Sequence, residues 1–132
     1  MFQENKVTVI ANWKMHGSLQ SNEIFLEKLL STLEDLNPSD FVCGIAIPTV
    51  HLFQFSSRLD NAPFCIGAQN VAQWGESGAF TGEISAKMLA EFDCKFSIVG
   101  HSERRKYFGE TDKIVARKAS SLLESGITPL VC

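Results

Sequence analysis

Residues that could carry chemistry directly follow two short apolar runs of the chain. Asn12 and Lys14 come after Val7–Ala11, and His101 comes after Phe96–Val99. A lysine supplies a fixed positive charge that holds an anionic ligand or a developing oxyanion. A histidine that opens a helix feels the helix N-terminus, which disfavours the imidazolium, and a neutral imidazole can donate to a carbonyl oxygen and shuttle protons. These residue types indicate a site for an anionic, carbonyl-containing ligand.

Each of these residues also has an ordinary structural explanation. Lys14 could be a solvated surface charge, and Glu103–Arg105 could be only the charged first turn of a helix. His16 and His51 are interpreted as packing or surface residues. The position of Lys14 and His101 at the ends of apolar runs favours a functional role for them. The structural and the functional interpretation nevertheless both stay open.

Short apolar runs alternate along the chain with segments of helical periodicity. The runs predict strands, and the apolar positions that recur every three or four residues predict helices. Ser18 or Ser21 could cap the first helix, Asn37-Pro38 would end it, and Thr111 is the expected cap of the last helix. The expected strands are 7–11, 41–47, 64–68, 96–99 and 127–132, and the expected helices are 18–36, 48–59, 83–92 and 111–124.

This order of elements predicts an α/β fold with a parallel sheet. Parallel strands need helical crossovers, and strands that are buried on both faces read as continuous apolar runs. The helices are therefore expected to pack outside the sheet. Because ligands bind beyond the carboxyl ends of such strands, we expect Asn12, Lys14 and His101 to share one rim.

The composition is that of one ordinary globular domain, residues 1–132. The chain is 45% hydrophobic and 20% charged, and its net charge of −3 argues against broad attraction to nucleic acid or anionic lipid. No secretory signal or membrane span is visible, so we expect a cytoplasmic protein. The spacing of the cysteines fits no metal site and predicts reduced, buried thiols: Cys43, Cys65, Cys94 and Cys132.

Several segments closely resemble triosephosphate isomerase. They are VIANWKMHGS (residues 9–18), GAQNVAQWGESGAFTGEIS (67–85), IVGHSERR (98–105), Glu110-Thr111 and PLVC (129–132). The resemblance covers essentially the whole chain in register. It implies a TIM (β/α)8 barrel truncated to its first five strands with their intervening helices, because a full barrel has about 250 residues.

The resemblance also implies roles for individual residues, with no cofactor and no metal. Lys14 would stabilise the negative enediolate and attract the triose phosphate substrate, and Asn12 would hydrogen-bond that substrate. His101 would be the neutral electrophile that relays protons between the two substrate oxygens. Glu103 would pair with Lys14, and Ser102 would help to fix the histidine.

The glycine-rich loop 69–82 has a role of its own in the resemblance. A long loop in a compact domain is usually functional or disordered, and the alternative is a merely flexible surface loop. In the family this loop enters a pocket of a neighbouring subunit, with Thr81 near its tip. A homodimer of the complete protein is therefore implied, with interface residues Met15, Gln69, Asn70, Phe80, Thr81, Gly82 and Glu83.

The chain departs from the family pattern because it lacks the segments that carry the catalytic base, the closing lid after the base, and the glycine-rich phosphate sites after the seventh and eighth strands. The family's catalytic base is a glutamate after the sixth strand, and no such segment occurs in the 132 residues. We therefore expect the chain to be inactive alone. Its two unpaired edges and the uncovered inner face of its sheet should make it associate, or need a complementing piece. The last expected strand reaches Cys132, which favours a longer parent chain over a short covered edge strand. The alternative function is a non-catalytic half barrel that binds an anion.

Overall fold

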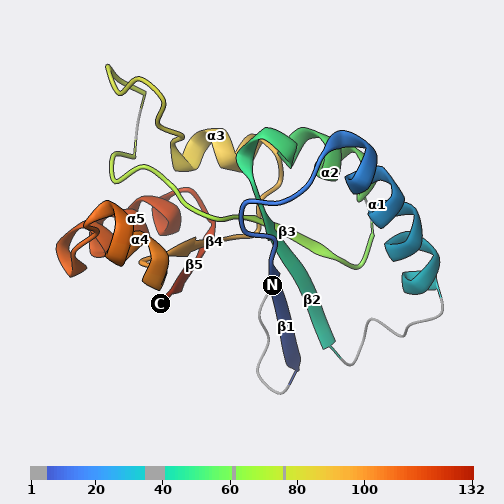
Figure 1. Cartoon of the computed structure of the whole chain (residues 1–132). Helices are drawn as coiled ribbons and strands as arrows, with labels where there is room; N and C mark the ends of the chain where they lie inside the picture. The colour runs from blue at the N-terminus through green and yellow to red at the C-terminus, as the bar shows by residue number, and fades with distance from the viewer. Residues whose placement is uncertain (1–5, 35–40, 61, 76) are drawn as a thin grey trace.

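Five parallel strands form one curved sheet in which neighbours in sequence are neighbours in space (Figure 1). The computed structural model describes residues 6–34, 41–60, 62–75 and 77–132. The predicted parallel α/β sheet is confirmed. Its strands are β1 (Val7–Asn12), β2 (Phe41–Ile47), β3 (Cys65–Ala68), β4 (Phe96–Val99) and β5 (Thr128–Val131).

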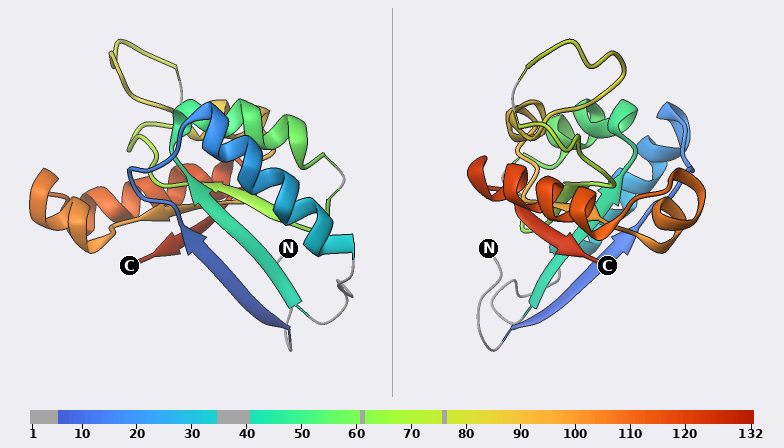
Figure 2. Two further views of the ribbon diagram at one scale, coloured as in Figure 1. Left: turned by 45° about the vertical axis from the view of Figure 1, so that its right-hand side comes forward. Right: turned by 90° about the vertical axis from the view of Figure 1, so that its left-hand side faces the viewer.

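The helices lie along one side of the curled sheet, as Figure 2 shows from two directions. Within the described residues, none of them is long and apolar enough to cross a membrane. The helical segments are α1 (Leu19–Glu34), the 3-10 turn η1 (Thr49–His51), α2 (Leu52–Arg58), α3 (Ala86–Glu91), α4 (Ser102–Phe108) and α5 (Asp112–Glu124).

Capping residues decide where the helices begin. The Thr111 hydroxyl accepts from the Ile114 N–H, which confirms the expected start of α5. Helix α3 starts three residues later than predicted, because Ser85 caps it by accepting from the Met88 N–H at 3.2 Å. Pro48 lies outside its helix, which opens as η1 before α2. The predicted end of the first helix, residues 35–38, lies outside the described residues.

Two hydrophobic clusters occupy opposite faces of the sheet. Adjacent residues of a strand point to opposite faces, and Ile45 and Ile47 join the larger cluster with the helices. Ala46 belongs instead to a smaller cluster, in which Phe96 and Ile98 are also buried. The inner face was expected to be uncovered, and this expectation is wrong in part, because the buried Phe96 ring packs there.

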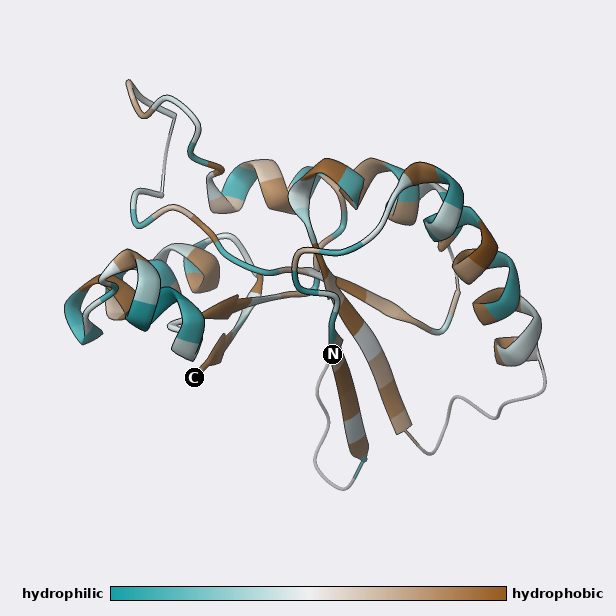
Figure 3. Cartoon of the chain, in the orientation of Figure 1, coloured by the Kyte–Doolittle hydropathy of each residue, from teal (hydrophilic) through white to brown (hydrophobic). Residues whose placement is uncertain are grey.

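The two edge strands are exposed, which corrects the expectation that the strands are buried on both faces. The side chains of Val7 and Val9 on β1 are 67% and 56% exposed, and Val131 on β5 is 62% exposed. Figure 3 shows that hydrophobic residues continue along β1 and β2. An unpaired apolar edge is a template for further strands.

The expectation of buried cysteines is wrong for Cys132, which is exposed, whereas Cys94 is buried. Cys43 and Cys65 are half-buried, and all four thiols are free. Burial, together with the neighbouring Asp93, raises the pKa of the Cys94 thiol to about 12. This thiol is consequently a packing group of low reactivity.

Gly67→Ala is expected to destabilise the fold by about 1–3 kcal/mol, because a methyl group would overpack the inner cluster. A Cβ at Gly67 would lie only 2.4–2.6 Å from carbons of the Phe96 ring. Urea unfolding followed by circular dichroism measures the loss. Gly75→Ala is the control, since its Cβ would meet nothing nearer than 3.5 Å. Equal stability of the two variants would contradict this packing of Phe96.

Candidate active site

The segment after β1 is held in a tight, unusual backbone conformation. The Asn12 Oδ1 accepts a hydrogen bond from the Lys14 N–H at 3.0 Å, and Lys14 has a φ of 55°. A positive φ is uncommon for a lysine and indicates a local constraint. The Trp13 ring between them packs edge-on against Phe25 and Phe55, with centroids 4.7 and 6.2 Å away. The aromatic core thus fixes the residues on either side of Trp13.

The residue after β3 fixes the same segment from the neighbouring strand. The Gln69 Nε2 donates to the Lys14 carbonyl at 2.9 Å and to the Ala46 carbonyl at 3.1 Å. The Trp13 N–H donates to the same Ala46 carbonyl at 2.9 Å. The carboxyl ends of β1, β2 and β3 are therefore joined directly by hydrogen bonds.

His101 is the N-cap of α4 and is held by the first turn of that helix. Its Nδ1 accepts a hydrogen bond from the Glu103 N–H at 3.2 Å. A neutral imidazole in this position keeps its proton on Nε2, which is then available to donate. Ser102 is exposed in the first turn of α4, and the described contacts include no hydrogen bond from its side chain to His101. The role of Ser102 as a support stays a prediction.

Glu103 joins the two halves of the site. Its Oε1 lies 2.6 Å from the Lys14 Nζ, and its Oε2 lies 3.5 Å from the His101 Nδ1. The pairing of Glu103 with Lys14, which the resemblance implied, is thus present. The hydrogen bond from the Lys14 ammonium holds the pKa of the Glu103 carboxyl below its ordinary value. The carboxylate form of Glu103 is consequently favoured.

One open cavity of about 370 Å³ brings these groups together at the carboxyl edge of the sheet. Asn12, Lys14 and His101 all line it, so the structure places the three predicted site residues at one rim. This volume suits a small organic ligand. Its further lining residues are Met15, Pro48, Thr49, Gln69, Asn70, Glu103, Arg104 and Phe108.

Lys14→Met is expected to raise the pKa of Glu103, because it removes the hydrogen bond that lowers it. Because the pKa of Glu103 is lowered in the fold, the ion pair stabilises the fold at pH values above the ordinary pKa of a glutamate. This stabilisation is lost as the pH falls through the lowered pKa. Titration of side-chain carboxyl carbons by NMR measures the change. Lys28→Met, an exposed lysine on α1, is the control, and an unchanged Glu103 titration would contradict the pairing.

The residues expected at a subunit interface divide into two groups. Met15 is 95% exposed, Phe80 is 39% exposed, and Thr81, Gly82 and Glu83 are exposed on the projecting loop. Two others are half-buried and bonded within the chain: Gln69 as described above, and Asn70 through a 2.6 Å contact to the Lys118 Nζ. Whether any of them meets a partner stays a prediction.

A buried ionic network behind the cavity was missed by the sequence reasoning. The Glu110 Oε1 accepts from the Lys118 Nζ and from the Arg104 Nε, each at 2.5 Å. Glu110 is 7% and Lys118 is 4% exposed. Burial alone would raise the pKa of Glu110, but the hydrogen bonds from Lys118 and Arg104 outweigh it and lower the pKa. The lysine on the apolar face of α5 was the available signal, because a buried lysine needs a partner.

Arg105 is a second residue whose role the sequence did not reveal. Its guanidinium donates to the Gly100 carbonyl at 2.8 Å, to Asp112 at 2.7 Å and to the Cys132 carbonyl at 3.1 Å. It therefore connects the end of β4, the start of α5 and the residue after β5. This contact set holds α4, which carries Glu103, against the sheet.

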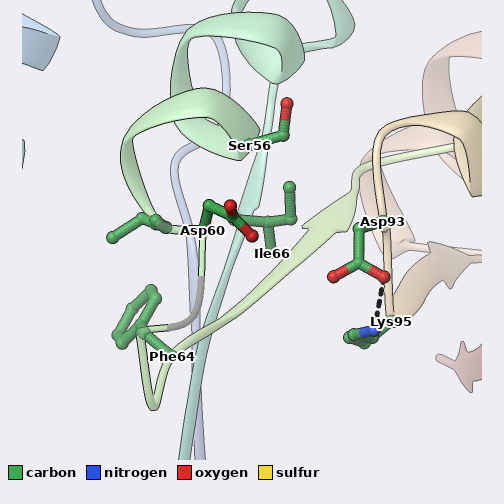
Figure 4. A pocket seen from close by; sticks show the side chains of 7 residues that line it. Ser56, Asp60, Phe64, Ile66, Asp93 and Lys95 are labelled. Atoms are coloured by element: carbon green, nitrogen blue, oxygen red, sulfur yellow. Dashed lines mark hydrogen bonds and ion pairs between the residues drawn. The ribbon is translucent and has the colours of Figure 1, made fainter.

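A smaller cavity of about 60 Å³ lies at the amino-terminal ends of β3 and β4 (Figure 4). Asp60 and Phe64 line one side of it, and the ion pair of Asp93 with Lys95 lines the other. A space of this size holds a few water molecules. The larger cavity at the carboxyl edge is therefore the candidate site.

The curled parallel sheet and the cavity at its carboxyl edge, to which several polar side chains contribute, define a chain of the (β/α)-barrel class. A family model described as triosephosphate isomerase matches residues 7–132. The chain belongs to the triosephosphate isomerase family.

Proteins named triosephosphate isomerase are also among its relatives. The one from Delftia acidovorans is 43% identical over 127 residues, which are 96% of this chain and 50% of the relative. The one from Ralstonia nicotianae is 47% identical over 124 residues, 94% of this chain and 48% of the relative. The chain spans about half the length of the curated relatives it matches.

Proposed function

We propose that this chain supplies the Asn12, Lys14 and His101 side of a triosephosphate isomerase site, which interconverts dihydroxyacetone phosphate and D-glyceraldehyde 3-phosphate in glycolysis and gluconeogenesis. The observation that carries the proposal is the convergence of these three side chains on one cavity at the carboxyl edge. The family to which the chain belongs supports it.

Each group has a defined task in this reaction. A base removes a proton from the carbon next to the substrate carbonyl, and an enediolate forms. The Lys14 ammonium stabilises the negative charge of the enediolate and of the phosphate, and the Asn12 amide orients the substrate. The His101 Nε2–H donates to the carbonyl oxygen and relays protons between the two oxygens, because Nδ1 is already engaged by the Glu103 N–H.

The described part of the chain offers no candidate for the base itself. Glu103 is the only carboxylate among the described residues that line the cavity, and it is bound to Lys14. In the family resemblance the base is a glutamate after the sixth strand. We propose that the 132-residue polypeptide supplies the electrophilic groups and that a complementing segment supplies the base.

Association is part of the proposal. The exposed Phe80, Thr81 and Gly82 lie on a projecting loop, and the exposed Met15 lies beside the cavity that this loop of a second copy would approach. The complete protein is proposed to be a cytoplasmic homodimer. The exposed apolar edges at Val9 and Val131 give the isolated chain a further reason to associate.

Reconstitution tests this function. The chain is co-expressed with the second half of the Ralstonia nicotianae relative, in a host that lacks its own isomerase, and the purified 1:1 complex is assayed with a coupled dehydrogenase. Recovered isomerisation that Lys14→Met abolishes supports the proposal. A soluble, folded complex that binds triose phosphate without turnover would favour the alternative, a half barrel that only binds an anion.

A further inference from the structure

The loop between β3 and α3 projects from the body of the molecule, and its tip, residues 77–82, is exposed (Figure 1). Such a loop normally loses its order unless contacts at its base hold it. The base of this loop lies against one face of α5, a helix that the proposed reaction does not use directly.

Three residues of the loop base meet three residues of α5. The Asn70 Oδ1 accepts from the Lys118 Nζ at 2.6 Å, and the Gln73 Oε1 accepts from the Arg117 Nη1 at 3.2 Å. Gly75 lies close enough to Ser121 that an added Cβ would be 3.5 Å from its hydroxyl. Residues 117, 118 and 121 lie on one side of a helix because of their spacing. The loop base therefore follows this side of α5.

The contact of Lys118 with Asn70 is the strongest of the three, because the Lys118 ammonium group is buried. A buried charge must be paired and hydrogen-bonded to be tolerated. The Lys118 ammonium meets this requirement with the Asn70 amide oxygen and the Glu110 carboxylate, which also binds Arg104 of α4. One ammonium group thus joins the loop base, α5 and the helix that His101 caps.

Further contacts carry this constraint from the base to the tip. The rings of Trp74 and Phe80 are stacked with centroids 4.1 Å apart and an interplanar angle of 9°. The Ala72 N–H donates to the Ile84 carbonyl at 2.8 Å, which ties the outgoing chain to the returning chain. Fixing Asn70 and Gln73 therefore also restricts Phe80 near the tip.

We propose that α5 is the platform that holds this loop in its projecting conformation, and that Lys118 is the positioning residue. The partner that receives the preformed tip is a second copy of the chain, and this choice of partner rests on the proposed homodimer. A loop that is ordered before binding loses less conformational freedom on association. Lys118 thereby links the order of the interface loop to the helix that carries the site.

Hydrogen exchange measured by mass spectrometry on the 132-residue chain tests this positioning role. Asn70→Ala removes the loop's acceptor and leaves the Lys118–Glu110 pair in place. Exchange in peptides covering residues 70–84, which include the Ala72 amide, is expected to become about tenfold faster, while β2 keeps its protection. Asn70→Asp keeps an oxygen acceptor for the ammonium, so its loop is expected to exchange like that of the unmodified chain.

Gln20→Ala, which removes an exposed amide on α1, is the matched control and should change neither region. Unchanged loop exchange in Asn70→Ala would overturn the proposal. So would an equal acceleration in β2, which indicates a general loss of stability, or failure of Asn70→Asp to restore protection. Because this readout needs no turnover, it is independent of the reconstitution assay.

Discussion

Assayed by itself, the 132-residue chain is expected to interconvert the two triose phosphates at least about 10²–10⁴-fold more slowly than a full-length relative, because a missing general base alone has this effect. Lys14 and His101, the groups proposed to act as electrophiles, line the same cavity. Electrophilic stabilisation accelerates proton removal only when a positioned base takes the proton.

Glu103 is not a replacement for that base. Its carboxylate lies 2.6 Å from the Lys14 Nζ, and this hydrogen bond lowers its pKa. A carboxylate with a lowered pKa is a weaker base, and proton transfer to it is less favourable. If Glu103 turned toward substrate, Lys14 would also lose the partner that orients it.

The measurement is a coupled-dehydrogenase assay of the purified chain beside the Delftia acidovorans relative, at equal concentration. The Lys14→Met chain is the control for contaminating host enzyme, whose activity does not depend on Lys14. Turnover within tenfold of the relative, abolished by Lys14→Met, would overturn the expectation and would require a base within these 132 residues.

The elements of the fold were predictable because their signals are local. The apolar runs at Phe41–Ile47 and Phe96–Val99 coincide with β2 and β4, and Thr111 caps α5 as expected. The start of α3 was missed because Glu83 and Ile84 fit a helical pattern equally well. The backbone pairing of Ile84 with Ala72, a contact across the loop, favours the extended form there.

The site was predictable to the extent that it depends on strand ends. Asn12, Lys14 and His101 follow parallel strands, so topology alone places them at one rim. Glu110 stood out in the sequence only as part of a segment that resembles the family. Its partners are six and eight residues away, and the network closes on Asn70, 48 residues from Lys118. Only the folded chain brings those groups together.

Glu110→Gln is expected to destabilise the fold by about 3–5 kcal/mol at neutral pH, because it leaves a buried charge without its counter-ion. Glu110 and Lys118 are 7% and 4% exposed, and the Lys118 ammonium would keep only neutral acceptors, the oxygens of Asn70 and of the new amide. The Arg104 guanidinium would lose the same carboxylate. Two cations of α4 and α5 would then face each other across a neutral amide.

Urea unfolding at a series of pH values measures this effect, with Glu27→Gln on the exposed side of α1 as a control within about 0.5 kcal/mol of the unmodified chain. The pKa of Glu110 is lowered in the fold, so its stabilising contribution is complete above the ordinary pKa of a glutamate and disappears as the pH falls through the lowered value. The difference between Glu110→Gln and the unmodified chain should therefore shrink in acid. Removal of one partner of a buried ion pair normally costs more than about 1 kcal/mol. A smaller loss of stability in Glu110→Gln would therefore show that the network contributes packing and not charge pairing. A stability difference that does not change with pH would show the same.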